Sequence, residues 1–247
     1  MPSLVRACAA VLAAVLAVLG LTVPAGPAAA KSAPRFDVVS LSMKDMVVSR
    51  NSGCPYSYVH LKSRTNVRTW DFHTRMTKGR TVLRIADTYP FSYPYADFDS
   101  RDHPRTARIG LCPYNKILGK ITIGPGHAFL KVGSKWIEKR SKVKGYFYIR
   151  AKSSLTASSR RSGSTVRVSA QAKRFNVDWQ HPRYVAYSPK RAQLQVKSGR
   201  GWKTVQTRNF SHGRAHFSVK QRGKRAYRVA YPRVSWATGA ATRTFTR

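Results

Sequence analysis

Hydrophobic and polar residues alternate along many short stretches of this chain, with turn residues between them. In Ala192–Gln206, Leu194 and Val196 alternate with polar neighbours, Ser198-Gly199-Arg200-Gly201 interrupts the pattern, and Trp202 begins a second alternating run. A period of two indicates a half-buried strand, and glycine readily adopts the positive φ of a tight turn. The stretch therefore predicts a β-hairpin.

The same alternation predicts short strands over most of the chain. In Thr165–Lys173, for example, Val166 and Val168 are expected to face inward and Arg167 and Lys173 outward. Strands are expected at Phe36–Val48, Tyr56–Lys62, Val67–Met76, Thr81–Asp87, Ala107–Cys112, Ile117–Ile123, Ala128–Val132, Ser134–Ile137, Tyr146–Ala151, Thr165–Ala172, Ala192–Lys197, Trp202–Thr207, Ala215–Lys220, Ala226–Tyr231 and Ala241–Thr246. We expect turns at Gly124-Pro125-Gly126, a long loop over Thr88–Arg105, and no helix beyond the N-terminal apolar segment. Regular short strands of this kind indicate an all-β sandwich protein.

The first 30 residues have the composition of a secretory signal peptide. Arg6 precedes the apolar run Ala7–Val23, and Ala28-Ala29-Ala30 fits the small-residue rule for cleavage. The alternative is a membrane anchor, but Gly20 and Pro24 break a run that is already short for a span. No later stretch is long and apolar enough to cross a bilayer. We expect a secreted, extracellular protein, with cell-wall association as one form of that location.

The C-terminal third of the sequence resembles a known class of module. The residues that carry the resemblance are Gly163-Ser164-Thr165-Val166, Leu194-Gln195-Val196 before Gly201-Trp202-Lys203-Thr204-Val205, and Tyr227-Arg228-Val229. This stretch is similar to the immunoglobulin-like or fibronectin-type-III-like β-sandwich modules of secreted bacterial proteins. The resemblance implies a spacer or an adhesive unit.

The Ser- and Arg-rich segment 153–163 has the composition of a domain boundary. We therefore expect two consecutive immunoglobulin-like antiparallel β-sandwich domains, at residues 31–152 and 164–247, joined by a linker at 153–163. Removal of Cys8 with the signal peptide leaves Cys54 and Cys112, and an even pair in an exported protein predicts one disulfide. The order Cys54, Trp70, Cys112 also resembles the cysteine–tryptophan–cysteine spacing of immunoglobulin domains.

The charge of the chain is extreme, with 46 Lys and Arg against 9 Asp and Glu and a formal net charge of +37. From Ala151 onward Asp178 is the only acidic residue. Such a chain is expected to bind polyanions, which outside a cell include wall polymers, acidic polysaccharides, anionic headgroups and, incidentally, nucleic acid. Two sets of basic residues are the candidate polyanion sites, namely Lys135, Lys139, Arg140, Lys142 and Lys144 around Trp136, and Arg167, Lys173, Lys197, Lys203, Lys220 and Arg228.

The second set makes one cationic face if its strands share a sheet. The alternative interpretation of both sets is a solvated surface that protects strand edges from aggregation, a role in which lysine is common.

Residues 89–103 form the most unusual local stretch. Aromatic side chains stand beside Pro90 and Pro94, and they either form a platform for a glycan or protein partner or cap the open end of the sandwich. These residues are Tyr89, Phe91, Tyr93, Tyr95 and Phe98. Asp97, Asp99 and Asp102 lie in the same stretch, but the glycine and closing glutamate of a calcium loop are missing. We expect no metal and no cofactor.

The sequence thus favours a non-catalytic cationic binding or structural module for an anionic cell-surface partner, a wall polymer or acidic glycan. One alternative is a secreted inhibitor or protein-binding factor that uses the aromatic residues 89–98. The other is a hydrolase using Asp97, Asp99, His103 or His73. The sequence contains neither a Gly-x-Ser-x-Gly nor a His-Glu-x-x-His motif, which would mark common hydrolase classes.

Overall fold

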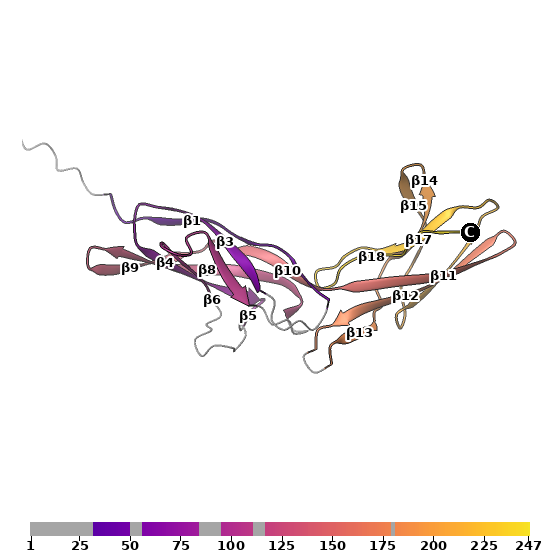
Figure 1. Cartoon of the computed structure of the whole chain (residues 1–247), viewed down its shortest axis with the longest axis horizontal. Helices are drawn as coiled ribbons and strands as arrows, with labels where there is room; N and C mark the ends of the chain where they lie inside the picture. Colours follow the sequence, from indigo (N-terminus) through magenta and orange to yellow (C-terminus); the bar gives the residue numbers. More distant parts are fainter. Residues whose placement is uncertain (1–31, 50–55, 84–94, 111–116, 179–180) are drawn as a thin grey trace, which may run out of the picture. The chain divides into compact units, whose positions relative to one another are not determined.

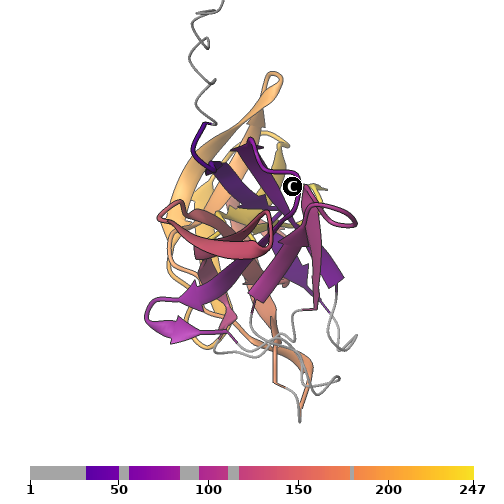
Figure 2. The same ribbon diagram turned by 90° about the vertical axis from the view of Figure 1, so that its left-hand side faces the viewer.

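Strands form nearly all the regular structure of this protein. The computed structural model describes residues 32–49, 56–83, 95–110, 117–178 and 181–247, and these ranges contain four sheets and no α-helix (Figures 1 and 2). The all-β prediction is confirmed. The expected signal peptide and both cysteines, Cys54 and Cys112, lie outside the described residues. Within the described ranges no helix is long and apolar enough to cross a membrane.

The N-terminal sandwich is built from sheets A and B. Sheet A has the order β1-β3-β7, and its strands are β1 (Phe36–Met43), β3 (Tyr56–Thr65) and β7 (Thr106–Gly110). Sheet B has the order β2-β10-β8-β4-β5, with β6 beside β4 and β9 beside β8. Its strands are β2 (Met46–Val48), β4 (Trp70–Lys78), β5 (Thr81–Val82), β6 (Tyr95–Asp99), β8 (Gly119–Val132), β9 (Lys135–Ser141) and β10 (Gly145–Ala151). The β2–β10 pair is parallel, and the other pairs are antiparallel.

Aromatic rings fill the space between sheets A and B. Phe72 and Phe98, on neighbouring strands of sheet B, are fully buried with ring centroids 6.1 Å apart. Phe36 on sheet A contacts the Trp70 ring at a centroid distance of 4.8 Å. Burial of side chains of this size stabilises the folded state by about 1.5–3 kcal/mol each. The alternation predicted for Val67–Met76 therefore contributes to the core, since it places Trp70 and Phe72 on the buried side of β4.

The Gly124-Pro125-Gly126 segment is not the predicted turn. It lies inside β8, which continues from Gly119 to Val132 and pairs with β4 on both sides of a register shift between Thr74 and Met76. A Cβ atom added to Gly126 would lie 2.5 Å from the Phe72 ring, so glycine allows the two strands to approach here. Gly124 has a φ of 95°, a conformation that favours glycine. The residues that suggested a turn instead form an irregularity within one long strand.

The C-terminal sandwich is built from sheets C and D. In sheet C, β12 pairs with β11 on one side and with β13 and β16 on the other. The strands of sheet C are β11 (Ser153–Ser162), β12 (Thr165–Asn176), β13 (Arg183–Ala186) and β16 (Arg214–Lys220). Sheet D has the order β15-β14-β17-β18, with β19 also beside β17. Its strands are β14 (Ala192–Ser198), β15 (Gly201–Arg208), β17 (Ala226–Tyr231), β18 (Ala240–Ala241) and β19 (Phe245–Thr246).

The core of the C-terminal sandwich follows the predicted alternation closely. Val166 and Val168 on β12, Phe217 on β16 and Leu194 and Val229 on sheet D are all buried in one cluster. The hairpin predicted for residues 192–206 is confirmed as β14 and β15, joined through Gly199 at a φ of 54°.

The segment predicted as a linker is strand β11. Its residues pair with β12 in an unbroken register from Ser153–Arg174 to Ser162–Thr165, and only Lys152 separates it from β10. Leu155 points into the core of the C-terminal sandwich, whereas Thr156, Ser158 and Arg160 are exposed. Small polar residues suit this strand because it has a neighbour on one side only, so much of its surface faces water.

Candidate anion-binding groove on sheet C

The outer face of sheet C is lined by basic and hydroxyl side chains. Successive side chains of a strand point to opposite faces, so the burial of Val166, Val168 and Ala170 turns Arg167 and Ser169 outward. The same alternation on β16 buries Phe217 and exposes its neighbours. The outward side chains of the three strands are Thr156, Ser158 and Arg160 on β11, Arg167, Ser169, Gln171 and Lys173 on β12, and Arg214, His216, Ser218 and Lys220 on β16.

The strand register arranges these side chains in rows across the sheet. One row contains Arg160, Arg167 and Ser218. The next row contains Ser158, Ser169 and His216, and the one after it Thr156, Gln171 and Arg214. Residues that are far apart in the sequence are therefore direct neighbours on one face.

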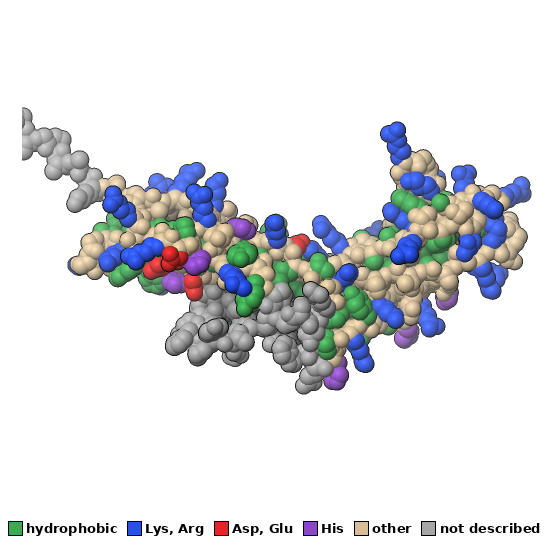
Figure 3. Space-filling model, viewed as in Figure 1, with side chains coloured by type: hydrophobic (Ala, Val, Ile, Leu, Met, Phe, Trp, Pro, Cys, Tyr) green, Lys and Arg blue, Asp and Glu red, His purple; other side chains and the backbone are tan. Residues whose placement is uncertain are grey.

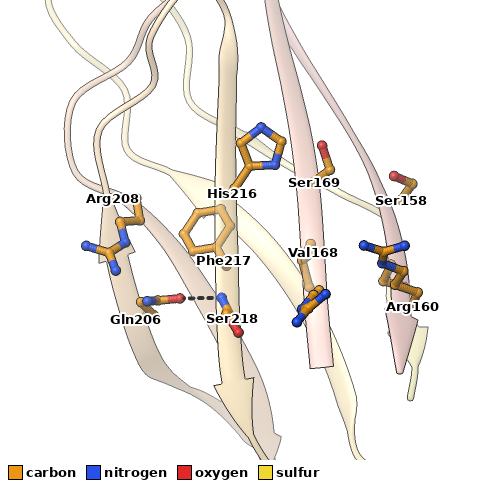
Figure 4. A pocket seen from close by; sticks show the side chains of 11 residues that line it. Ser158, Arg160, Val168, Ser169, Gln206, Arg208, His216, Phe217 and Ser218 are labelled. Atoms are coloured by element: carbon orange, nitrogen blue, oxygen red, sulfur yellow. Dashed lines mark hydrogen bonds between the residues drawn. The ribbon is translucent and has the colours of Figure 1, made fainter. Parts of the chain in front are cut away.

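A shallow groove runs over these rows (Figure 4). It has a volume of about 560 Å³ and is lined by Ser158, Ser159, Arg160, Arg167, Val168, Ser169, Gln206, Arg208, His216, Phe217 and Ser218. Strand β15 closes one side, because the backbone N–H of Ser218 donates to Oε1 of Gln206 at 3.0 Å. A second hollow of about 380 Å³, lined in part by Arg214, shares Ser158, Ser169 and His216 with the first. We call the combined surface the sheet C groove.

Four arginine side chains in the groove have no partner within the described part of the chain. Arg160, Arg167, Arg208 and Arg214 are exposed, and no hydrogen bond, ion pair or ring contact of their guanidinium groups occurs among the described residues. The described residues that line the groove include no carboxylate. Since Asp178 is the only acidic residue from Ala151 onward, this sandwich has almost no carboxylates of its own to pair with them. The arrangement offers charged donors and hydroxyl groups to an external anion.

The six cations predicted to form one face are divided between two sheets. Arg167, Lys173 and Lys220 lie on sheet C, whereas Lys197, Lys203 and Arg228 lie on sheet D. The condition for a single face, that all their strands share a sheet, is not met.

Two of the sheet D cations have partners within the protein. The Arg228 guanidinium lies 4.4 Å from the centroid of the Trp202 ring, and the Lys197 ammonium lies 5.4 Å from it. Nε of Arg228 donates to Oε1 of Gln195 at 2.7 Å. These contacts fix the positions of both charges and stabilise the outer face of sheet D.

The basic set at 135–144 is also divided. Lys135, Lys139 and Arg140 lie on β9, and Lys142 and Lys144 follow it. Alternation along β9 places Lys135 and Lys139 on one side of the strand and Arg140 on the other. Arg140 shares its side with Glu138, whose carboxylate accepts from Nε of Arg140 at 3.3 Å. The basic residues of β9 therefore point to both sides of the strand, and Arg140 is paired with the carboxylate of Glu138.

Acidic and histidine side chains of β4, β6, β8 and β9 lie together on the outer face of sheet B, where red and purple side chains are grouped in Figure 3. His73 on β4 is 2.7 Å from Asp97 on β6, and His127 on β8 is 2.7 Å from Glu138 on β9. The hydrogen bond to Asp97 outweighs the effect of burial and raises the pKa of His73 above 6.5. The hydrogen bond from His127, helped by Arg140, lowers the pKa of Glu138 below its usual value.

The remaining candidate residues of the acidic stretch have structural partners. Asp99 accepts from the backbone N–H groups of Asp102 and Arg101 at 2.6 and 2.8 Å and lies 3.2 Å from His103. The Asp102 N–H bond is the largest cause of the lowered pKa of Asp99. No group of three or more histidine, cysteine or acidic side chains suited to a metal occurs among the residues described. For the hydrolase alternative, the structure offers exposed histidine–carboxylate pairs on a sheet face.

Most of the predicted aromatic loop lies outside the described residues. Tyr89, Phe91 and Tyr93 belong to the segment 84–94, and the side chain of Tyr95 is likewise not described. Phe98 is 1% exposed and packs in the core, so it does not belong to a surface platform. Phe98 is thus a core residue of β6 beside Phe72.

Several groove residues were absent from the sequence-based set, namely Ser158, Arg160, Ser169, Arg208, Arg214, His216 and Ser218. The Ser- and Arg-rich composition of segment 153–163 predicts a linker and so gives no reason to place Arg160 and Ser158 on a sheet face. The usable signal was there, since Leu155 and Ala157 alternate with polar residues in the manner of a strand.

No protein-family model and no curated protein matches this chain. Solved structures to which it is similar include the fibronectin(III)-like modules of Clostridium thermocellum CbhA, at 11% identity over 84% of this chain and 93% of that one, with a TM-score of 0.33. The D0-D1 domain of intimin aligns over 86% and 98% of the two chains at 11% identity and a TM-score of 0.27. A marsupial T cell receptor aligns over 84% and 73% at 10% identity and a TM-score of 0.35. Because these TM-scores are low, the description of the architecture depends on the sheets observed in this chain.

Proposed function

We propose that this protein is an extracellular, non-catalytic module that binds an anionic polymer at the cell surface through the sheet C groove. The observation that carries the proposal is the set of four arginines around this groove that have no partner among the described residues, together with a described lining that contains no carboxylate. Arginine donates in a planar fork that matches phosphate and carboxylate oxygens. The N-terminal signal-like sequence supports an extracellular location.

The groove supports this role better than net charge alone does. A surface that only prevents aggregation needs charge anywhere along exposed strand edges. Here Arg167 and Ser169 lie on β12, which has neighbours on both sides within sheet C. Arg160, Arg208 and Arg214 lie on the edge strands β11, β15 and β16, but Arg167 on the central strand, with hydroxyl groups beside it in a hollow, favours contact with a ligand.

The test measures binding of the mature chain, Lys31–Arg247, to purified cell wall with and without its anionic polymers over a range of salt concentrations. Binding through phosphates is expected to fall linearly in a log–log plot against salt, with a slope of about 0.7–0.9 per neutralised phosphate. Replacing Arg160, Arg167, Arg208 and Arg214 by Gln is expected to remove most of the binding and to reduce this slope by about 3.

A matched control removes the same charge elsewhere on the C-terminal sandwich. Lys190, Arg200, Lys203 and Arg225 are exposed and do not line the groove, so their replacement by Gln is expected to leave most of the binding intact. If both variants lose binding equally, the protein binds through net charge and not through the groove. If the unmodified chain does not bind walls that carry anionic polymers, the proposed function is wrong.

A further inference from the structure

The basic residues of sheet C continue beyond the groove as a regular ladder. Five successive outward rows each contain at least one basic side chain: Lys220, then Arg160 with Arg167, then His216, then Arg214, then Lys173. All six side chains are exposed. The ladder runs along the direction of β12, from Thr165, which pairs with Lys220, to Lys173 itself.

Strand geometry sets the spacing of this ladder. Neighbouring rows are two residues apart along β12, which corresponds to about 7 Å. The whole ladder from Thr165 to Lys173 therefore extends over about 27 Å. A linear polyanion whose charges repeat at the same interval, lying along β12, meets a Lys or Arg side chain at four of the five rows and the His216 imidazole at the middle row.

Resting on the proposed function, we propose that the ligand is a linear phosphodiester polymer with three carbon atoms between successive phosphates, bound along β12. Such a backbone repeats every six single bonds, and it advances by about 7 Å per phosphate when extended. Its anionic groups then match the ladder row by row. Polyphosphate has a much closer spacing, and acidic polysaccharides with one carboxylate per disaccharide have a wider one.

The groove chemistry also favours phosphate in a polymer without bases. Arg160 and Arg167 face each other across one row, and Ser158 and Ser169 across the next, so guanidinium and hydroxyl donors alternate along the ladder. This mixture suits the oxygens of a phosphodiester. Single-stranded nucleic acids have a similar phosphate interval, but their binding sites normally stack bases on aromatic rings. The lining contains no exposed Phe, Tyr or Trp ring, because Phe217 is 2% exposed.

The experiment compares synthetic oligomers that differ only in spacing. The dissociation constants of propanediol phosphate and hexanediol phosphate oligomers are measured by calorimetry with the mature chain, at equal numbers of phosphates. The propanediol series is expected to bind about tenfold more tightly at five phosphates, and its affinity is expected to stop rising beyond that length, because the ladder has five rows. Oligothymidylate of the same phosphate number is expected to bind no more tightly than the propanediol oligomer.

Variants at the two ends of the ladder make the test specific. Lys173→Gln with Lys220→Gln shortens the ladder from five rows to three, so the affinity is expected to stop rising at three phosphates. Lys190→Gln with Lys203→Gln removes the same charge outside the ladder and is expected to leave that length unchanged.

The outcomes separate the ligand class from the proposed function. Equal affinity for the propanediol and hexanediol series overturns the spacing match, while the binding of polyanions through the groove stands. Markedly tighter binding of oligothymidylate overturns the choice of a polymer without bases. If none of the oligomers binds, and walls carrying anionic polymers are also not bound, both the inference and the proposed function are wrong.

Discussion

The outer face of sheet B and the outer face of sheet C both carry basic side chains, but the charges have different surroundings. On sheet B, His73, His127 and Arg140 each lie within 3.3 Å of a carboxylate oxygen. On sheet C, the arginines of the groove have no carboxylate partner among the described residues. Both faces are formed by outward side chains of paired strands, and the two differ in the distribution of acidic residues along the sequence.

This difference shows that net charge does not locate a binding surface in a strongly basic protein. A cation that already contacts a carboxylate gains less from a second anion, because part of its field is neutralised. Eight of the nine acidic residues precede Ala151, so pairing is concentrated in the N-terminal sandwich. The C-terminal sandwich therefore presents the larger free positive field, and the following predictions test that contrast.

The largest expected effect comes from the floor of the groove. Phe217 is 2% exposed and packs beneath the outward row residues His216 and Ser218. Phe217→Ala is expected to lower the free energy of unfolding by about 3–5 kcal/mol, because it removes a buried ring and leaves a cavity. Denaturant unfolding measures this change, with Val205→Ala at an exposed position as the control, expected to change stability by about 0.5 kcal/mol or less. If Phe217→Ala lowered the free energy of unfolding as little as the control does, the Phe217 ring would not be packed in the core beneath the groove.

A carboxylate placed in the groove should give the arginines of sheet C an acidic partner, as the basic side chains of sheet B already have. Ser158 is exposed and adjoins the Arg160–Arg167 row. Ser158→Glu is expected to weaken polyanion binding about tenfold at low salt, because the new carboxylate pairs with an arginine and repels the ligand. Ser198→Glu adds the same charge at the exposed end of β14 and serves as the control. Similar losses in both variants would show that location is unimportant.

Removal of the carboxylates from sheet B should have the opposite effect. Asp97→Asn with Glu138→Gln removes the carboxylate partners of His73, His127 and Arg140. We expect the affinity for an anionic polymer to rise about threefold at low salt and the salt slope to steepen, since additional phosphates are neutralised. Asp102→Asn, which alters the net charge without removing a carboxylate partner of these three side chains, is expected to have a smaller effect. An unchanged affinity in the double variant would show that sheet B does not bind polyanions even when unpaired.

The smallest expected effect is the pH dependence of the His73–Asp97 pair. The folded protein raises the pKa of His73 above 6.5, mainly through the hydrogen bond to Asp97, with Asp71 adding to the effect and His127 lying opposite on β8. A raised pKa stabilises the fold fully below pH 6.5, and this stability is lost as the pH rises through the folded-state pKa.

The contribution is expected to stay below about 1 kcal/mol, because the two side chains are 41% and 60% exposed. NMR titration of His73, together with unfolding measured at several pH values, tests the effect. Asp97→Asn should return the pKa toward 6.5 and remove the matching pH dependence of stability. A His73 pKa that does not move in this variant would contradict the assigned cause.

Local pattern was a sound guide wherever one face of a strand is buried. Alternation around Val166 and Leu194 predicted both the strands and their inward residues, because a one-residue slip would expose the whole apolar set. The alternation of apolar and polar residues did not predict strand β11, where small polar residues dominate and Leu155 is the large side chain that is buried. It was misleading at Gly124-Pro125-Gly126, where the requirement for glycine comes from the Phe72 ring of another strand.

The sequence by itself determined the all-β class, the excess of positive charge and its separation from the acidic residues. These properties follow from composition and from the two-residue period of a strand. The pairing of β11 and β16 with β12 was decided only by the tertiary structure. Pairing across a sheet joins residues that are distant in the sequence, such as Arg160, Arg167 and Ser218, and no local pattern encodes which strands become neighbours. The groove therefore arises from strand order, and its charge from composition.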